Sequence, residues 1–326
     1  MTLNFILKRL TYGILVLIAV VITITTIVSA APIDAALMTF GQNANPEAIA
    51  AKRAELHLDD GLIKQVGGYL NDLSPIGKRK DGSWGLKYPN LRESYQSGRP
   101  VSAIMAEAIP QTAILALTAI LLALLIGIPA GISAALHHGK WQDNLILSFT
   151  TLGISLPSYV VGILLAYIFG VWLTAFTGLD HAGSLMDYDD QGYPCMRWHH
   201  LILPTIALGL RPVASITQLT RAAMLDVLSQ DYIRTARAKG LNERTVIYKH
   251  AFRNALSPVI TATSGWFAAL LTGAVFVEYV FDYKGLGATM IDHLLVFDLP
   301  VVLGISLFVA LVFIVVNLLT DLMRKA

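Results

Sequence analysis

Side chains that could bind a metal ion gather in one loop of the sequence, between residues 178 and 200. Carboxylate and imidazole groups are present there at Asp180, His181, Asp187, Asp189, Asp190, His199 and His200. This mixture of oxygen and nitrogen donors suits a divalent transition metal. The donors follow no tight ligand spacing, so we favour a solvated acidic loop and assign no metal-binding residue. Cys195, the single cysteine, excludes an internal disulfide and a cysteine-based metal cluster.

The familiar catalytic signatures are missing from the sequence. It has neither a phosphate-binding G-x-x-x-x-G-K-[ST] loop nor a zinc-binding H-E-x-x-H helix. Gly285 and Gly287 do not form a dinucleotide fingerprint, and no serine lies in a nucleophile elbow. We therefore expect no active site and no bound cofactor in this chain. Energy for any pumping has to come from another protein.

A basic segment, DYIRTARAKGLNERTVIYKHAFRNALSP at residues 231–258, lies between two apolar stretches. Its basic residues are Arg234, Arg237, Lys239, Arg244, Lys249 and Arg253, against the two acids Asp231 and Glu243. The small residues Ala236, Ala238 and Gly240 favour a close-packed contact with another protein. Two alternatives are a basic amphipathic element on anionic lipid and an ordinary positively charged loop.

The pattern of this segment predicts two short helices joined by a tight bend. The first has an apolar face of Leu225, Leu228, Tyr232 and Ala236, and the second a face of Val246, Ile247, His250 and Ala251. Gly240 fits a left-handed helix end, and Asn242 fits the cap of the second helix. Pro258 is predicted to end the second helix and to start the next apolar stretch.

The elements that position these residues are predicted membrane spans. The sequence is 55% hydrophobic and 14% charged, whereas a soluble domain has about 25% charged residues. Six segments are apolar over the roughly 20 residues that cross a bilayer, at 10–31, 112–136, 145–176, 201–219, 258–280 and 299–319. All six are predicted to be helices. The first is too long for a signal-peptide core and is interpreted as uncleaved. The third is longer than a bilayer needs, and Pro157 near its start predicts a kink or an extension beyond the lipid.

Charge predicts the orientation of these spans. With the N-terminus in the cytoplasm, the inside segments hold twelve Lys and Arg residues against five acids. Lys and Arg concentrate in short cytoplasmic loops, so both termini and the basic segment are predicted to lie inside. The predicted domains are an N-terminal helix (1–31), an extracytoplasmic region (32–111) and a five-helix core (112–326). That core includes the basic loop at about 225–257.

The extracytoplasmic region is predicted to contain one short helix at residues 48–58 and a loop at 74–90. Lys78, Arg79 and Lys80 in that loop are interpreted as a solvated patch, and no nucleic-acid partner is expected.

The basic segment resembles the EAA loop, the cytoplasmic loop of permease subunits in binding-protein-dependent ABC importers. Counted back from Gly240, the Glu-Ala-Ala triplet positions are Arg234, Thr235 and Ala236, so only the last alanine matches. The stretches YIRTARAKGL and HAFRNALSPV are similar to the oligopeptide, dipeptide and nickel branch of the family. Further similar motifs follow in order at residues 6–10, 97–101, 126–131, 201–204, 278, 285–287 and 298–302.

The resemblance implies a type I ABC importer permease fold in the bacterial cytoplasmic (inner) membrane. It implies a heterodimer with a second permease, two cytoplasmic ATPase subunits that bind ATP and Mg, and an extracytoplasmic substrate-binding protein. Membrane lipid surrounds the spans. The residues expected to dock on an ATPase are Arg234, Thr235, Ala236, Arg237, Lys239, Gly240, Leu241 and Asn242.

Polar residues inside the later spans are candidates for the translocation path, because such residues often mark one. They are Arg211, Thr217, Gln218, Ser264, Trp266 and Glu278. Ser and Thr equally often bond a backbone carbonyl or join helices. Arg211 is the strongest of these candidates, since a charge inside a span needs a partner or water. Glu278 is expected near the outside end of its span, where it could meet the binding protein or a cationic peptide terminus, or simply lie at the interface.

The function implied is import of short peptides by an ATP-driven ABC importer, with this chain as a permease subunit. A nickel or other small-solute importer is the alternative within the family. A self-sufficient secondary transporter and a membrane scaffold are alternatives of other classes. The cargo itself is not specified by this sequence.

Overall fold

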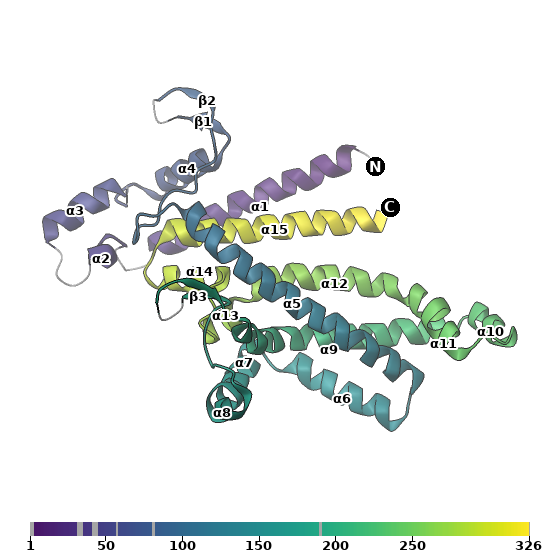
Figure 1. The fold of residues 1–326 in the computed structure, drawn as a ribbon. Coiled ribbons are helices and arrows are strands. Elements are labelled where there is room, and N and C mark those ends of the chain that lie inside the picture. Colours follow the sequence, from purple (N-terminus) through teal and green to yellow (C-terminus); the bar gives the residue numbers. More distant parts are fainter. Residues whose placement is uncertain are drawn as a thin grey trace. The chain divides into compact units, whose positions relative to one another are not determined.

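The computed structural model describes residues 3–30, 35–40, 45–56, 58–79, 82–188 and 191–325. Lys80, Asp189 and Asp190, which the sequence pointed to, lie outside this part. Most of the described chain is helical (Figure 1), and it divides into two compact units. One unit comprises residues 1–110 and 285–318, and the other comprises mainly residues 111–284. The long helix α5 (Val101–Leu136) begins in the first and continues into the second.

The first unit contains the N-terminal helices and the last two helices of the chain. Its elements are α1 (Leu3–Ala30), α2 (Ala35–Phe40), α3 (Pro46–Glu55), α4 (Leu62–Leu73), β1 (Ile76–Lys78), β2 (Trp84–Leu86), α14 (Leu286–Leu295) and α15 (Leu299–Lys325). Val21 of α1, Tyr69 of α4 and Leu303 of α15 share one buried cluster. A second cluster joins the start of α5 to α14 and α15.

Two expectations for the outside region need correction. The helix predicted at 48–58 instead runs from Pro46 to Glu55. It begins there because Asn45 caps it by accepting a hydrogen bond from the Glu47 amide at 3.1 Å. The stretch 74–90, predicted to be loop, contains an antiparallel hairpin in which Ile76 pairs with Leu86. Three-residue strands with polar turns leave little alternating pattern, which is why the sequence did not reveal them.

A buried carboxylate ties two distant segments of the first unit together. Asp298, just before α15, is fully buried and accepts hydrogen bonds from the Ser94 hydroxyl and, at 3.0 Å, from the Tyr95 amide. His293 Nδ1 lies 3.0 Å from the same carboxylate. These contacts connect the segment that leads into α5 with the start of the 298–302 motif stretch.

This carboxylate predicts a pH-dependent stability. Burial opposes ionisation, but the hydrogen bonds of His293, Ser94 and the Tyr95 amide outweigh it and lower the pKa of Asp298. A depressed pKa stabilises the fold above about pH 4, the value of an unfolded Asp, and that stabilisation is lost as pH falls below it. In detergent, we expect the melting temperature of the wild type to fall between about pH 5 and pH 3.

The variant Asp298→Asn is expected to melt lower at neutral pH and to show a flatter slope in the acid range. Its control is Glu55→Gln, which removes an exposed carboxylate of the same unit. Equal acid slopes in the wild type and Asp298→Asn would contradict the assignment. The measurement is a thermal melt of purified protein across pH.

The second unit is a helical bundle with one small hairpin. Its elements after α5 are α6 (Trp141–Ser155), α7 (Ser158–Tyr167), a π-helical turn η1 (Ile168–Trp172), α8 (Thr174–Thr177), β3 (Met186–Tyr188), β4 (Pro194–Met196), the 3₁₀ turn η2 (Trp198–Leu201), α9 (Ile202–Leu228), α10 (Asp231–Ala238), α11 (Glu243–Thr245), the π-helical turn η3 (Val246–Phe252), α12 (Arg253–Gly273) and α13 (Val275–Val280). Helix α9 contacts α6, α7, α12 and α13, so it is the centre of the unit.

Close approach of α5 and α9 depends on small residues. A Cβ atom added at Gly131 would lie 2.6 Å from the Thr217 carbonyl oxygen, so no larger residue fits there without movement. Leu115 and Ala119 of α5, Leu208 of α9 and Val277 of α13 then share the main buried cluster. Packing of this kind is how membrane helices associate when lipid offers no hydrophobic driving force.

Four of the six predicted spans are found, with changed limits. Four described helices are long and apolar enough to cross a membrane: Leu7–Ala30, Val101–Leu136, Trp198–Leu228 and Leu299–Leu318. The third predicted span is instead two helices, Trp141–Ser155 and Ser158–Trp172, bent by 100°. Pro157 at this break confirms a disruption, although the bend is far sharper than a kink. Helix α12, over the predicted fifth span, is not among the four.

Candidate functional site

The bend in the basic segment is built by its own backbone. Helix α10 ends at Ala238, and the amides of Gly240 and Leu241 bond back to the carbonyls of Arg237 and Ala236, at 2.9 and 3.4 Å. This is the Schellman arrangement, which needs a left-handed residue after the helix. Gly240 has φ of +74°, as predicted.

The second half of the segment begins at the predicted cap. The Asn242 side-chain oxygen accepts a hydrogen bond from the Arg244 amide at 3.1 Å, and α11 starts at the next residue. Arg237 and Glu243 join the two halves through an ion pair at 2.7 Å. The hydrogen bond from Arg237, aided by its charge and opposed by slight burial, lowers the pKa of Glu243. The bend is therefore held by backbone, cap and ion pair together.

The segment packs on a core of its own. That core contains Ile132, Ala135, Ala223, Met224, Ile233, Ala236, Val246, Ile247, Ala251 and Ala255. Its members come from the ends of α5 and α9 as well as from the basic segment. Figure 1 shows α10 and α11 at the far ends of α9 and α12. The bend is thus a structured projection of the bundle rather than a free loop.

The predicted apolar faces are partly wrong. Leu225 and Leu228 belong to α9, which runs to Leu228 before a two-residue break. The buried face of α10 is made by Ile233 and Ala236, whereas Tyr232 is exposed and accepts a hydrogen bond from the Asn254 side chain at 2.9 Å. The break after Leu228 rotates the face by restarting the helical period. In the second half, Val246, Ile247 and Ala251 are buried as predicted, and His250 is half-buried.

Pro258 does not end a helix, contrary to the prediction. The helix continues without interruption from Glu243 through the π turn η3 into α12, and Pro258 lies inside α12. A π turn adds a residue to the helical repeat and often occurs at functional positions. The bend is therefore connected to α12 by one continuous helix.

The outer surface of the bend carries most of the residues predicted to dock. Arg234, Thr235, Arg237, Lys239, Gly240, Leu241 and Asn242 are exposed. Ala236 is 7% exposed and faces the internal core instead. The surface therefore combines three basic side chains with the apolar Leu241, while Ala236 supports it from beneath. We call these seven exposed residues the coupling surface.

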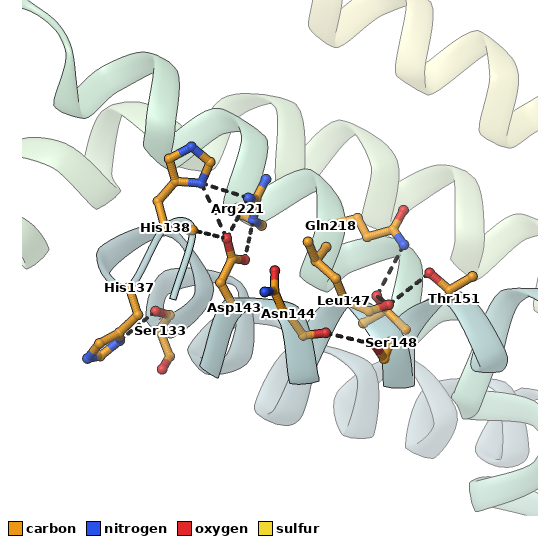
Figure 2. A network of polar contacts seen from close by, with 12 residues as sticks. Ser133, His137, His138, Asp143, Asn144, Leu147, Ser148, Thr151, Gln218 and Arg221 are labelled. Carbon is orange, nitrogen blue, oxygen red and sulfur yellow. Dashed lines mark hydrogen bonds and ion pairs between the residues drawn. The ribbon is translucent and has the colours of Figure 1, made fainter. Parts of the chain in front are cut away.

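A buried ion pair near the coupling surface was not recognised from the sequence. Asp143 of α6 is buried, and Arg221 of α9 bonds both of its carboxylate oxygens, at 2.6 and 2.7 Å (Figure 2). The Gly139 amide donates to the same carboxylate at 2.9 Å, and His138 Nδ1 lies 3.3 Å from it. Arg221 is three positions before Met224, which belongs to the core of the coupling segment. Asp143 lies between Gln142 and Asn144 in a polar stretch, so no signal of its burial was present in the sequence.

The predicted path residues have different environments. Thr217 is buried and donates to the Val213 carbonyl of its own helix at 2.7 Å, and Ser264 donates to the Ile260 carbonyl at 3.1 Å. Both hydroxyl groups therefore donate to a carbonyl of their own helix, which is the structural alternative to a role in the path. Arg211 is exposed on the surface of this chain.

Two other path candidates join helices. Gln218 donates to the Thr150 hydroxyl at 3.1 Å, which ties α9 to α6. The Trp266 indole donates to the Ser215 hydroxyl at 3.1 Å, which ties α12 to α9. Both are half-buried and act as contacts within the bundle.

Glu278 requires a correction of its predicted place. It is fully buried in α13 and accepts a hydrogen bond from the Thr112 hydroxyl of α5 at 2.7 Å. It is neither at the interface with solvent nor on a surface that a binding protein could reach in this structure. The sequence could not reveal this because the partner lies 166 positions away.

Family comparisons agree along nearly the whole chain. Residues 127–326 match the model of the binding-protein-dependent transport system inner membrane component, and residues 2–118 match the model of its N-terminal part. The chain is 36% identical over 318 residues to a protein of Brucella abortus named as a peptide transport system permease, covering 98% of this chain and 95% of the relative. It is 35% identical over 327 residues to the glutathione transport system permease protein of Escherichia coli, covering 99% and 97%.

Solved structures support the fold. A structure of the methionine ABC transporter MetNI in an inward-facing conformation aligns with a TM-score of 0.50 at 15% identity, over 68% of this chain and 96% of that chain. A second crystal form aligns with a TM-score of 0.51 at 14% identity. Together with the family matches, these findings confirm the resemblance drawn from the basic segment and the type I importer permease fold. The chain belongs to the family of binding-protein-dependent transport system inner membrane components, the multi-pass permeases of ABC importers.

Proposed function

We propose that this chain is a permease subunit of an ATP-driven importer that moves short peptides across the bacterial cytoplasmic membrane. Family membership and the names of the relatives, peptide and glutathione permeases, support this cargo class over nickel or another small solute. The chain itself binds no cofactor in this proposal. ATP hydrolysis, with ATP and Mg, takes place on two separate cytoplasmic ATPase subunits.

The observation that carries the proposal is the coupling surface. Its bend is fixed by a Schellman motif, an Asn cap and the Arg237–Glu243 pair, and its base packs on α5 and α9. A rigid projection joined to packed helices transmits displacement as a rigid-body motion. In the proposed mechanism, closure of the ATPases moves this surface and switches a cavity between outward and inward access.

The proposed assembly places both termini and the coupling surface in the cytoplasm. The concentration of Lys and Arg in the basic segment supports this orientation. A second, homologous permease completes the translocation path, and an extracytoplasmic binding protein delivers the peptide. Membrane lipid covers the remaining apolar surface.

Arg211 is the path residue we propose first. Its side chain is exposed on α9, and a charge at that depth needs water or a partner from the second permease. We expect Arg211→Gln to reduce peptide uptake at least fivefold while leaving ATPase activity and assembly unchanged. Arg99→Gln, an exposed arginine outside the spans, is the control. Uptake is measured in proteoliposomes, and an unchanged rate for Arg211→Gln would remove this residue from the path.

The proposed function is tested by affinity purification of the chain from its native membrane in mild detergent, followed by mass spectrometry. We expect a second permease of the same family and one or two ATPases to co-purify. Binding protein loaded with a dipeptide or tripeptide should then stimulate ATP hydrolysis in proteoliposomes. Stimulation by nickel-loaded binding protein instead would favour the alternative cargo. Recovery of the chain alone, stable and monodisperse, would favour a self-sufficient transporter and contradict the proposal.

A further inference from the structure

Three potential metal ligands of the 178–200 loop converge in the structure. Asp180, which follows α8, and His199 and His200 of η2 offer ligand atoms that all lie within 4.8 Å of one another. Asp180 Oδ2 lies 3.1 Å from His199 Nε2 and 3.1 Å from His200 Nε2. The other donors of this loop that the structure describes, His181 and Asp187, are not members of the group. We propose that Asp180, His199 and His200 form a binding site for one divalent transition-metal ion of the zinc class.

The hydrogen bonding of His200 supports a cation at this point. Its Nδ1 lies 2.9 Å from the Ser184 carbonyl oxygen, which is an acceptor, so Nδ1 carries a hydrogen. Its Nε2 faces Asp180 Oδ2, a second acceptor. A neutral imidazole has one N–H, so the second contact requires another proton or a metal ion at Nε2.

The surroundings of His200 are those of an oriented metal ligand. Metal-binding histidines donate their other ring N–H to a carbonyl or carboxylate, which fixes the tautomer, and Ser184 supplies that carbonyl. Ser184 is held in turn, because its hydroxyl accepts a hydrogen bond from the Lys284 amide at 2.6 Å. Gly183 packs closely against the ring, since a Cβ added there would lie 2.4 Å from the Cε1 and Nδ1 atoms of His200. The ring is therefore fixed before any ion arrives.

The donor set and its spacing suit zinc. Zinc binds imidazole nitrogen and carboxylate oxygen at about 2.0–2.2 Å, which places two tetrahedral ligand atoms about 3.4 Å apart. The 3.1 Å separations of Asp180 Oδ2 from both nitrogens are close to this value. Three protein ligands leave a further position for water or an arriving group. Asp180 and His199 are partly exposed, so an ion can reach the site from solvent.

A metal here would close the loop that carries the β3–β4 hairpin. Asp180 and His199 lie 19 positions apart, at the two ends of that loop. In the proposed orientation the loop is extracytoplasmic. Ion binding would fix the hairpin to the bundle through His200, and it would do so whichever cargo the transporter carries.

The test is zinc titration of the full chain, purified in detergent with a tag that lacks histidine and first freed of metal by a chelator. We expect one Zn²⁺ per chain by calorimetry and a higher melting temperature with zinc, because binding to the folded state stabilises it. His199→Ala and Asp180→Asn, both at partly exposed positions, should each weaken binding at least tenfold and remove the zinc-dependent rise. Co²⁺ should give the absorption of a nitrogen- and oxygen-bound ion.

Matched controls lie in the same loop. His181→Ala and Asp187→Asn should bind zinc as the wild type does. Cys195→Ser should also be unchanged, and a thiolate-to-cobalt absorption band would place the ion on Cys195 instead. The proposal is overturned if the wild type shows no stoichiometric binding, or if His199→Ala and Asp180→Asn bind zinc with wild-type affinity. Each readout is independent of transport.

Discussion

Replacing Gly240 with valine is expected to uncouple ATP hydrolysis from substrate-loaded binding protein. A left-handed conformation costs an L-residue roughly 1–2 kcal/mol, and more when the side chain is β-branched. Since an added Cβ at Gly240 meets nothing within 4 Å, the cost is backbone strain at the bend and not a clash. The Schellman bonds of Gly240 and Leu241 would be lost, and the coupling surface would change shape. We expect stimulated ATPase activity to fall at least tenfold.

The measurement is ATPase activity of the reconstituted complex with and without loaded binding protein. Gly82→Val is the matched control, because Gly82 has φ of +84° and open space around it but lies in the β1–β2 hairpin. If both substitutions reduced stimulated ATPase activity equally, the loss would come from general backbone strain and not from the bend. Full stimulation in Gly240→Val would show that the shape of this bend is not what couples the subunits.

The second large effect is expected at the buried pair of Asp143 and Arg221. Removing one partner of a buried pair leaves an uncompensated charge and costs about 3–5 kcal/mol. Arg221→Met leaves the buried Asp143 carboxylate with only the Gly139 amide and His138 near it. We therefore expect Arg221→Met to lower the melting temperature sharply and to reduce the yield of folded protein.

A double-mutant cycle separates the pair from its parts. Asp143→Leu combined with Arg221→Met removes both charges and should be less destabilised than the two single variants added together. Arg234→Met is the control, because Arg234 and Asp231 form an exposed pair at 3.4 Å and surface pairs contribute little. Additive losses in the cycle would mean that the two side chains stabilise the fold independently. Thermal melts in detergent provide the data.

Features set by neighbours in sequence were predictable. The left-handed Gly240 and the Asn242 cap depend on a few consecutive residues, and both were confirmed. Four of the six apolar spans were located because lipid requires long hydrophobic helices. Their limits shifted, as at α5, which begins at Val101 instead of residue 112 because helices extend beyond the bilayer. The family followed from the same short motifs.

Features that depend on distant residues were not predictable. Asp143 and Arg221 are 78 positions apart, and Ser94 and Asp298 are 204 apart. A sequence contains no period or spacing that identifies such partners. The same reason hid the burial of Glu278 and the convergence of Asp180 with two histidines. Pro258 was misjudged for another reason, since a helix that is already formed and packed can contain a proline that local preference would place at its end.

The unbroken helix from Glu243 to Gly273 makes the coupling surface one end of a lever. At about 1.5 Å per residue this arm is about 46 Å long, and Gly240 at the bend lies three residues before its first residue. A tilt of about 5° would move one end relative to the other by about 4 Å, roughly the width of an extended peptide backbone in a sheet. A small push on the basic end would therefore be enough to displace the far end of α12 by this distance.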